Sequence, residues 1–284
     1  MDDPYSHCES LLRAADRDRW LAALFAPPPA RPHLHALGAF AVEIARVRAA
    51  AREPLPGEVR LQWWRDALAG EARGGVSSHP VAAALLDTVA RHGLPHEPLT
   101  AFIDAHAFDL YDDAMASLAD LDAYAGRTAG ALFLLAAHVL GGTEGAGASA
   151  AAAGPAGIAS GIAGRLRSFP HDLALRQMFV PLEVLAAAGV TRGEADARRN
   201  TQGLRMALAA VRDHARAAFA RFAAAAPGVP DACAPALLPA ALAPQLLARL
   251  EAGSADPFAA VEVAPWRRQW ALWRAARRWP RLPG

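Results

Sequence analysis

The 284-residue chain carries 29 basic and 28 acidic side chains, giving a formal net charge of +1, and 54% of its residues are hydrophobic. This charge balance argues against nucleic acid as a partner, and the hydrophobic share is large enough for one sizeable core. The two cysteines, Cys8 and Cys233, lie far apart in the chain. Such sparse cysteines argue against a disulfide framework and fit a reducing cytoplasm.

The N-terminus and the uncharged stretches indicate a protein that does not span a membrane. The first residues, MDDPYSHCES, are acidic and polar, unlike a secretory signal. One long uncharged stretch, Gly145–Gly164, consists mostly of Ala, Gly and Ser, which is too weakly apolar to cross a bilayer. We therefore expect a cytoplasmic protein, at most peripheral to the inner membrane.

The hydrophobic pattern predicts an all-α fold. β-Branched residues are sparse and never alternate over a useful length, whereas apolar residues recur at spacings of three and four. A glycine-rich break is expected at residues 141–145, and a loop or short cap over Ala225–Pro244. We expect one domain over residues 1–284, with short helices between Pro181 and Arg199 and longer ones over Ser6–Leu24, His33–Arg52, Gly57–Ala69, Pro80–His92, Glu97–Met115, Leu118–Leu140, Ala156–Ser168, Thr201–Ala226 and Pro257–Trp279.

Three segments concentrate the charged side chains that could carry chemistry. In Ala36–Ala49, ALGAFAVEIARVRA, acidic and basic residues lie about one helical turn apart. In Gly157–Pro181 they gather around an expected helix end at Pro170, and in Phe102–Tyr124 three aspartates recur at helical spacing. The candidate ligand-binding residues from these segments are Glu43, Arg46, Arg165, Arg167, His171, Asp172, Arg176, Asp109 and Asp113.

These segments resemble the squalene/phytoene synthase family. ALGAFA stands where Ala-Leu-Tyr-Ala-Phe-(Cys/Ala) is usual, and RLQWWRDAL resembles the helix that follows. DLYDDAMASLADLDAYAGRTAGALFLLAAHVLG resembles the middle of the family, and LRSFPHDLALRQMFVP aligns with its second motif. The resemblance covers Tyr5–Val190 and implies an isoprenoid-synthase-like helical bundle around a central cavity. Enzymes of this family join two isoprenyl diphosphates head to head, and two aspartate-rich motifs hold the diphosphates through Mg²⁺.

The aspartate-rich motifs are largely lost. The first, Asp-Asp-x-x-Asp, falls on residues 45–49, which read Ala-Arg-Val-Arg-Ala, and the second, Asp-x-x-(Glu/Asp)-Asp, falls on residues 168–172, where only Asp172 remains. Because alanine has no donor atom and arginine stays protonated, neither can ligate Mg²⁺. We therefore expect no catalytic residue, no metal site and no cofactor.

This pattern of loss resembles a catalytically degenerate branch of the family, which includes the mitochondrial complex I assembly factor. The resemblance implies a non-catalytic role in assembling NADH dehydrogenase, with complex I subunits or assembly proteins as partners. It also implies a cavity that could bind a lipid or an isoprenoid.

The arginines in the motif regions allow two interpretations. They could bind a phosphate or carboxylate directly, without a metal ion. Alternatively, Glu43 pairs with Arg46, and Asp172 pairs with Arg167 or Arg176, so that the ion pairs fill a former pocket. The second is the simpler interpretation.

Two other functions remain open. One is a head-to-head prenyl transferase in which Glu43, Asp172 and the cluster around Asp109 supply Mg²⁺ ligands. The other is a peripheral membrane adaptor that acts through the C-terminal segment PWRRQWALWRAARRWP. Its tryptophans fall on one helical face among arginines, a pattern typical of interfacial binding. The same face could instead close a hydrophobic core, as the terminal helix of a bundle does, and this is the interpretation that we prefer for Trp266, Trp270 and Trp273.

Overall fold

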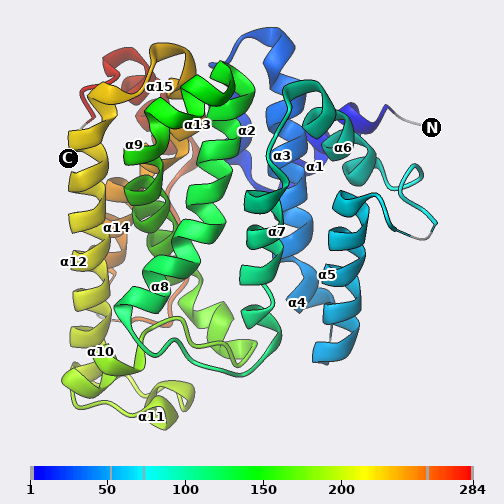
Figure 1. Ribbon diagram of the computed structural model, residues 1–284. Helices are drawn as coiled ribbons and strands as arrows, with labels where there is room; N and C mark the ends of the chain where they lie inside the picture. Colours follow the sequence, from blue (N-terminus) through cyan, green and yellow to red (C-terminus); the bar gives the residue numbers. More distant parts are fainter. Residues whose placement is uncertain (1–2, 52, 73, 254–255, 283–284) are drawn as a thin grey trace.

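The computed structural model describes residues 3–51, 53–72, 74–253 and 256–282, and these residues form a bundle of helices (Figure 1). They contain no β-strand, and the one isolated bridge joins Ala114 to Met178. The predicted all-α fold is therefore confirmed.

The N-terminal half consists of helices whose ends follow local sequence signals. α1, α3, α5 and α6 each have proline in their first turn, where the missing N–H breaks no helical bond. α5 and α6 end at Gly70 and Gly93, whose φ angles of 77° and 60° stop a helix at little cost. The elements of this half are α1 (Pro4–Ala15), α2 (Arg17–Ala23), η1 (Pro28–Ala30), α3 (Arg31–Ala45), α4 (Val47–Ala50), α5 (Pro54–Ala69), α6 (Pro80–His92) and α7 (His96–Ala105).

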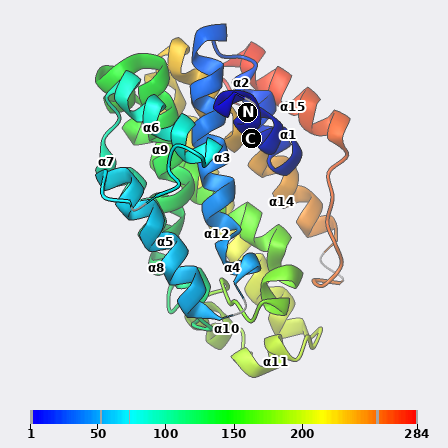
Figure 2. The ribbon, with the colours of Figure 1, turned by 90° about the vertical axis from the view of Figure 1, so that its right-hand side faces the viewer.

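The C-terminal half is built around the long element α9. In Figure 2, α2 and α15 lie at one end of the bundle and α10 and α11 at the other. The elements are η2 (Phe108–Leu110), α8 (Leu118–Ala125), the π-helical turn η3 (Gly126–Gly130), α9 (Ala131–Ala174), α10 (Leu182–Ala187), α11 (Arg192–Asp196), α12 (Gln202–Ala225), η4 (Ala226–Gly228), η5 (Asp231–Cys233), α13 (Ala234–Leu237), η6 (Leu238–Leu242), α14 (Ala243–Ala252) and α15 (Pro265–Arg278).

α9 is a helical hairpin. Gly142 has non-helical dihedral angles, φ 64° and ψ −163°, and divides α9 into a first arm (residues 131–141) and a second arm (residues 143–174). A methyl group on Gly157 would lie 2.5 Å from Cα of Gly130, so only glycine lets the second arm pack this closely on η3. Gly161 lies similarly against Ala125. The expected break at residues 141–145 is confirmed at Gly142.

Two large hydrophobic clusters form the core. One joins α1, α3, α5, α6 and α7 to the first arm of α9, with Phe40 and Trp64 among its buried side chains. The other joins α8, the second arm of α9, α12 and α13, around Phe133 and Phe222. By length and composition alone, the helical stretches Leu118–Ala174 and Asp231–Ala252 could cross a membrane, but more than half of each apolar window is buried inside the bundle.

Several predicted boundaries were wrong, and one helix was missed. The second arm of α9 begins at residue 143 rather than at Ala156, and the helix expected over Ser6–Leu24 is divided into α1 and α2 at Asp16. The helix expected over Glu97–Met115 ends at Ala105, because the backbone of Met115 bonds instead to Met178 and Leu182. The helix α14 was missed, since its proline sits in the first turn, where it is compatible with a helix. The last helix begins at Pro265 rather than Pro257.

Candidate functional site

A central cavity of about 810 Å³ lies among the helices of the bundle. Its wall is formed by the end of α1, α2, α3, α7, α8, η3, both arms of α9, η6, α14 and α15. Apolar side chains such as Val42, Phe102, Leu132 and Phe133 supply much of the surface. The central cavity implied by the family resemblance is therefore present and open, and the ion pairs expected to fill it do not do so.

Positive charge dominates the cavity wall. Its charged side chains are six arginines and two aspartates, accompanied by two histidines. Both aspartates are neutralised: Asp16 accepts a hydrogen bond of 2.8 Å from Arg19, and Asp18 lies 2.6 Å from Arg268. The remaining charged residues and histidines of the wall are Arg17, Arg46, Arg165, Arg167, His106 and His171.

The two stretches that correspond to the aspartate-rich motifs line the same cavity. Ala45 and Arg46 come from the end of α3, while Ser168 and His171 come from the second arm of α9. Arg46 follows the last residue of α3 as its C-cap, and its exposed side chain forms no ion pair with any residue that the structure describes. An unpaired guanidinium thus stands where the family motif has an aspartate.

Glu43 is not among the residues that line the cavity. Burial raises the pKa of Cys8, and the negative charge of Glu43 adds to this rise. Burial lowers the pKa of His79, and the charge of Glu43 partly opposes that shift. The charge of Glu43 therefore acts on side chains of α1 and of the N-cap of α6. The expected Glu43–Arg46 pair is wrong within the described part of the chain.

Arg176 and Asp113 also lie outside the cavity, beyond the end of α9. Arg176 pairs at 3.2 Å with Asp112, and Arg48 lies 3.6 Å from the same carboxylate while donating a 3.0 Å hydrogen bond to the carbonyl of Leu175. Asp113 is exposed. Asp109, Asp112 and Asp113 were expected on one helical face. Asp109 lies in η2 instead, and Asp112 and Asp113 lie in the irregular segment after it.

Asp172 pairs with Arg165 rather than with Arg167 or Arg176. The distance between guanidinium nitrogen and carboxylate oxygen is 3.5 Å, and Arg165 also lies over the ring of Phe179, 4.7 Å from its centroid. Burial raises the pKa of Asp172 to about 6, although the charge of Arg165 opposes this shift. Asp172 is buried behind the cavity wall, where Arg165 shields it.

A polar cluster supports this part of the wall. It consists of the buried side chains His106, Asp109, Tyr124 and Asp172 and the partly exposed Arg165. The hydroxyl of Tyr124 donates to Asp109, at 2.9 and 3.1 Å from its two carboxylate oxygens. Burial raises the pKa of Asp109 and lowers that of His106. Sequence reasoning did not single out His106 or Tyr124, although both lie in the segment Phe102–Tyr124 and His106 precedes Asp109 by one turn.

The donor atoms of this site do not fit the Mg²⁺ cluster that the family implies. Mg²⁺ takes oxygen ligands, and the motif positions on α3 carry alanine and arginine instead. The two aspartates in the wall are bonded to arginines, and Asp109 and Asp172 are buried behind it. Among the described residues, no group of three or more His, Cys, Asp or Glu side chains could hold a metal ion.

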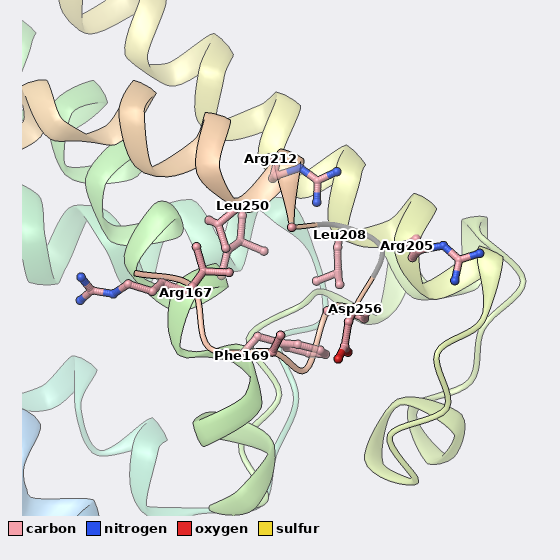
Figure 3. Close-up of a pocket in the computed structure, with 12 residues that line it drawn as sticks. Arg167, Phe169, Arg205, Leu208, Arg212, Leu250 and Asp256 are labelled. Atoms are coloured by element: carbon pink, nitrogen blue, oxygen red, sulfur yellow. The ribbon is translucent and has the colours of Figure 1, made fainter. Parts of the chain in front are cut away.

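A second, much smaller pocket lies between the second arm of α9, α12 and α14 (Figure 3). Its volume is about 30 Å³, which is room for little more than a water molecule. Arg167 borders both this pocket and the central cavity, and in Figure 3 its guanidinium points away from Arg205 and Arg212. We therefore place the candidate site in the central cavity.

Comparison with known sequences agrees with the geometry of the cavity. A sequence model described as Squalene/phytoene synthase matches residues 12–274. The chain belongs to the squalene/phytoene synthase family. The family resemblance seen in the motifs is thereby confirmed.

Among its relatives are proteins named NADH dehydrogenase (ubiquinone) complex I, assembly factor 6. The rat protein is 35% identical over 198 residues, which are 70% of this chain and 59% of the relative. The human protein is 32% identical over 68% of this chain and 57% of the relative. The chain thus spans a little under three fifths of the length of these curated relatives. The predicted relationship to the complex I assembly factor is confirmed.

Solved structures of this family share the fold. The squalene synthase HpnC from Alicyclobacillus acidocaldarius is 26% identical, with a TM-score of 0.73 over 90% of this chain and 95% of that one. A dehydrosqualene synthase in complex with a ligand has a TM-score of 0.80 over 95% of this chain and 94% of that one. It is only 17% identical, so its likeness concerns the fold alone.

Proposed function

We propose that this chain acts in the assembly of respiratory complex I and that its central cavity binds an anionic lipid or isoprenoid without Mg²⁺. The observation that carries this proposal is Arg46, an unpaired guanidinium that faces the cavity at a position where the family motif has an aspartate. The names of the relatives support the assembly role.

The chemistry of the wall suits an anionic amphiphile. Guanidinium groups bind phosphate or carboxylate directly, through paired hydrogen bonds that need no bridging ion. Arg46 and Arg167 line the cavity and have no ion-pair partner among the described residues. Their guanidinium N–H groups can therefore donate hydrogen bonds to such a ligand. A volume of about 810 Å³ with apolar surface at Val42, Leu132 and Phe133 can accommodate a hydrocarbon chain.

The binding step is tested by isothermal titration with farnesyl diphosphate and with short-chain phosphatidic acid, each without and with Mg²⁺. We expect binding that needs no metal and that Arg46→Ala weakens about tenfold or more, the effect of losing one charged hydrogen bond. Arg176→Ala is the matched control, because it removes an exposed arginine outside the cavity. The two ligands distinguish an isoprenoid from a phospholipid.

Absence of binding heat for both ligands would contradict the cavity proposal, and so would binding that requires Mg²⁺. A result in which Arg46→Ala and Arg176→Ala bind equally well would place the anion elsewhere. Ligand binding in the cavity and the role in assembly are tested independently, because binding is measured on the purified protein and assembly in cells.

The assembly role is tested by deleting the gene in its host and measuring NADH:quinone activity in isolated membranes. We expect the activity to fall in the deletion strain and to return with the wild-type gene. Complementation with Arg46→Ala then shows whether ligand binding is needed for assembly. Full membrane activity in the deletion strain would contradict the role.

A head-to-head prenyl transferase remains the alternative, because the likeness to the squalene synthase HpnC covers most of the chain. It is tested by incubating the protein with farnesyl or geranylgeranyl diphosphate, Mg²⁺ and NADPH and measuring released diphosphate. Because the donor set does not fit Mg²⁺, we expect no release above that of buffer. Release that depends on Mg²⁺ and on the protein would favour the transferase.

A further inference from the structure

The last helix, α15, presents its aromatic side chains to solvent rather than to the core. Trp266, Trp270 and Trp273 are 63%, 54% and 42% exposed, so the prediction that this stripe closes the core was wrong. The core side of α15 is instead formed by Leu272 and Ala275, which are buried in a small cluster with α2 and η6.

The exposed face of α15 is also strongly basic. The helix contains five arginines and no acidic residue. Arg268 is held by Asp18 at 2.6 Å, which fixes α15 to the start of α2. The other four arginines form no ion pair with any described residue, and they are Arg267, Arg274, Arg277 and Arg278.

The aromatic and basic side chains of this face lie together. Arg267 lies over the ring of Trp266 and Arg277 over that of Trp273, each 5.2 Å from the ring centroid. The rings of Trp270 and Trp273 stack at 4.8 Å. The tryptophans and Arg277 follow one another at spacings of three or four residues, which places them on one side of the helix.

We propose that this face of α15 docks on the surface of an anionic lipid bilayer. Tryptophan and arginine are the side chains that favour the headgroup region, where an indole ring meets apolar and polar groups together. Four unpaired arginines complement the negative charge of phosphatidylglycerol or cardiolipin headgroups. A helix lying in the bilayer plane needs only one such face, and Leu272 and Ala275 on the other side keep α15 attached to the bundle.

The docking surface lies next to the central cavity. Arg268 lines that cavity, so α15 contributes to its wall with one side and faces outward with the other. A lipid anion leaving the bilayer would thus enter the cavity beside α15. This route rests on the proposed function, whereas docking itself does not.

Docking is tested with the full-length protein and vesicles of phosphatidylcholine, alone or mixed with phosphatidylglycerol, in a flotation assay. We expect the protein to float with the mixed vesicles, not with the neutral ones, and to be released as salt concentration rises. Trp266→Ala, Trp270→Ala and Trp273→Ala combined should reduce the floating fraction about tenfold. The matched control removes three apolar side chains elsewhere that are at least as exposed on average, Leu55, Val59 and Met206, by substitution to alanine.

A second variant replaces the four unpaired arginines with glutamine and should lose the preference for phosphatidylglycerol while keeping the fold. Circular dichroism and urea unfolding verify that each variant is folded. Equal flotation of wild type and the tryptophan variant would overturn the proposal, and so would failure of the wild type to float. If the wild type instead forms a dimer that the tryptophan variant does not, the face belongs to a second copy and the proposal is wrong. A negative flotation result would not change the result expected from titrating the cavity with its ligands, so the two proposals can fail separately.

Discussion

A guanidinium nitrogen of Arg165 lies 3.5 Å from one carboxylate oxygen of Asp172, while the other oxygen of Asp172 is buried with no hydrogen-bond partner among the described residues. One long ion pair does not compensate for the removal of this carboxylate from water. The pKa of Asp172 is accordingly raised to about 6, with burial as the main cause and Arg165 opposing it.

Asp172 should make the protein less stable as the pH rises from about 4 to about 6. Over this range the folded protein keeps a proton that the unfolded chain has released, so the free energy of unfolding falls with pH. Asp172→Asn removes the effect, and we expect its stability relative to wild type to rise by about 2 kcal/mol between about pH 4.5 and about pH 8. Urea unfolding at both pH values measures this, with the exposed Asp213→Asn as control. If the difference in unfolding free energy between wild type and Asp172→Asn does not change with pH, the raised pKa is not that of Asp172.

Tyr124→Phe should destabilise the protein. The phenol donates to both oxygens of Asp109, and both side chains are buried, so the substitution leaves a buried carboxyl group without its donor. Such a loss costs about 1–3 kcal/mol. Urea unfolding should show this decrease, whereas Tyr111→Phe, which removes an exposed hydroxyl bonded to Glu58, should change little. Similar effects for the two variants would mean that the hydroxyl of Tyr124 contributes nothing to stability.

Gly157→Ala should disturb the contact between η3 and the second arm of α9. The added methyl would meet the backbone of Gly130 at 2.5 Å, and backbone cannot move aside as a flexible side chain can. Overpacking of this kind costs about 1–3 kcal/mol. Gly147→Ala, on the same arm, exposed and with nothing within 4 Å of the new methyl, should instead stabilise the helix by about 0.5–1 kcal/mol. Thermal unfolding measures both, and the prediction fails if their effects have the same sign.

The pair Asp18–Arg268 should hold α15 against the bundle. Its partners are 21% and 26% exposed and are joined by a 2.7 Å hydrogen bond, so solvent screens the pair only partly. A double-mutant cycle with Asp18→Asn and Arg268→Gln should give a coupling energy of about 1 kcal/mol in urea unfolding. The exposed pair Asp87–Arg91 on α6 provides the comparison and should couple more weakly. Equal coupling in the two pairs would show that the partial burial of Asp18 and Arg268 adds nothing.

Much of the helical fold follows from local sequence. Proline in the first turn and glycine after the last residue mark helix ends in the N-terminal half. The segment around Met115 was not predictable in this way. Its backbone pairs with residues more than sixty positions away, and such long-range pairing leaves no local signal.

Part of the site was predictable from the sequence. Arg46 and His171 at the motif positions line the cavity, and so do the predicted Arg165 and Arg167 just before the second motif. Glu43 lies one turn before Arg46 but is not among the residues that line the cavity, whereas Val42, Ala45 and Arg46 are. His106 and Tyr124 were not predicted as site residues. A polar residue joins a buried cluster through tertiary packing, and the spacing of residues along the chain does not indicate such packing.

The arginines of the cavity wall have a consequence for how this site can be controlled. The chain contains no lysine, so its basic side chains are all guanidinium groups, which stay protonated at every physiological pH. The arginine contribution to the positive potential of the cavity is therefore constant: acidification cannot change it, and acetylation of side-chain amines cannot cancel it. Acetylation, which can silence a site built from lysines, thus offers no control over this one.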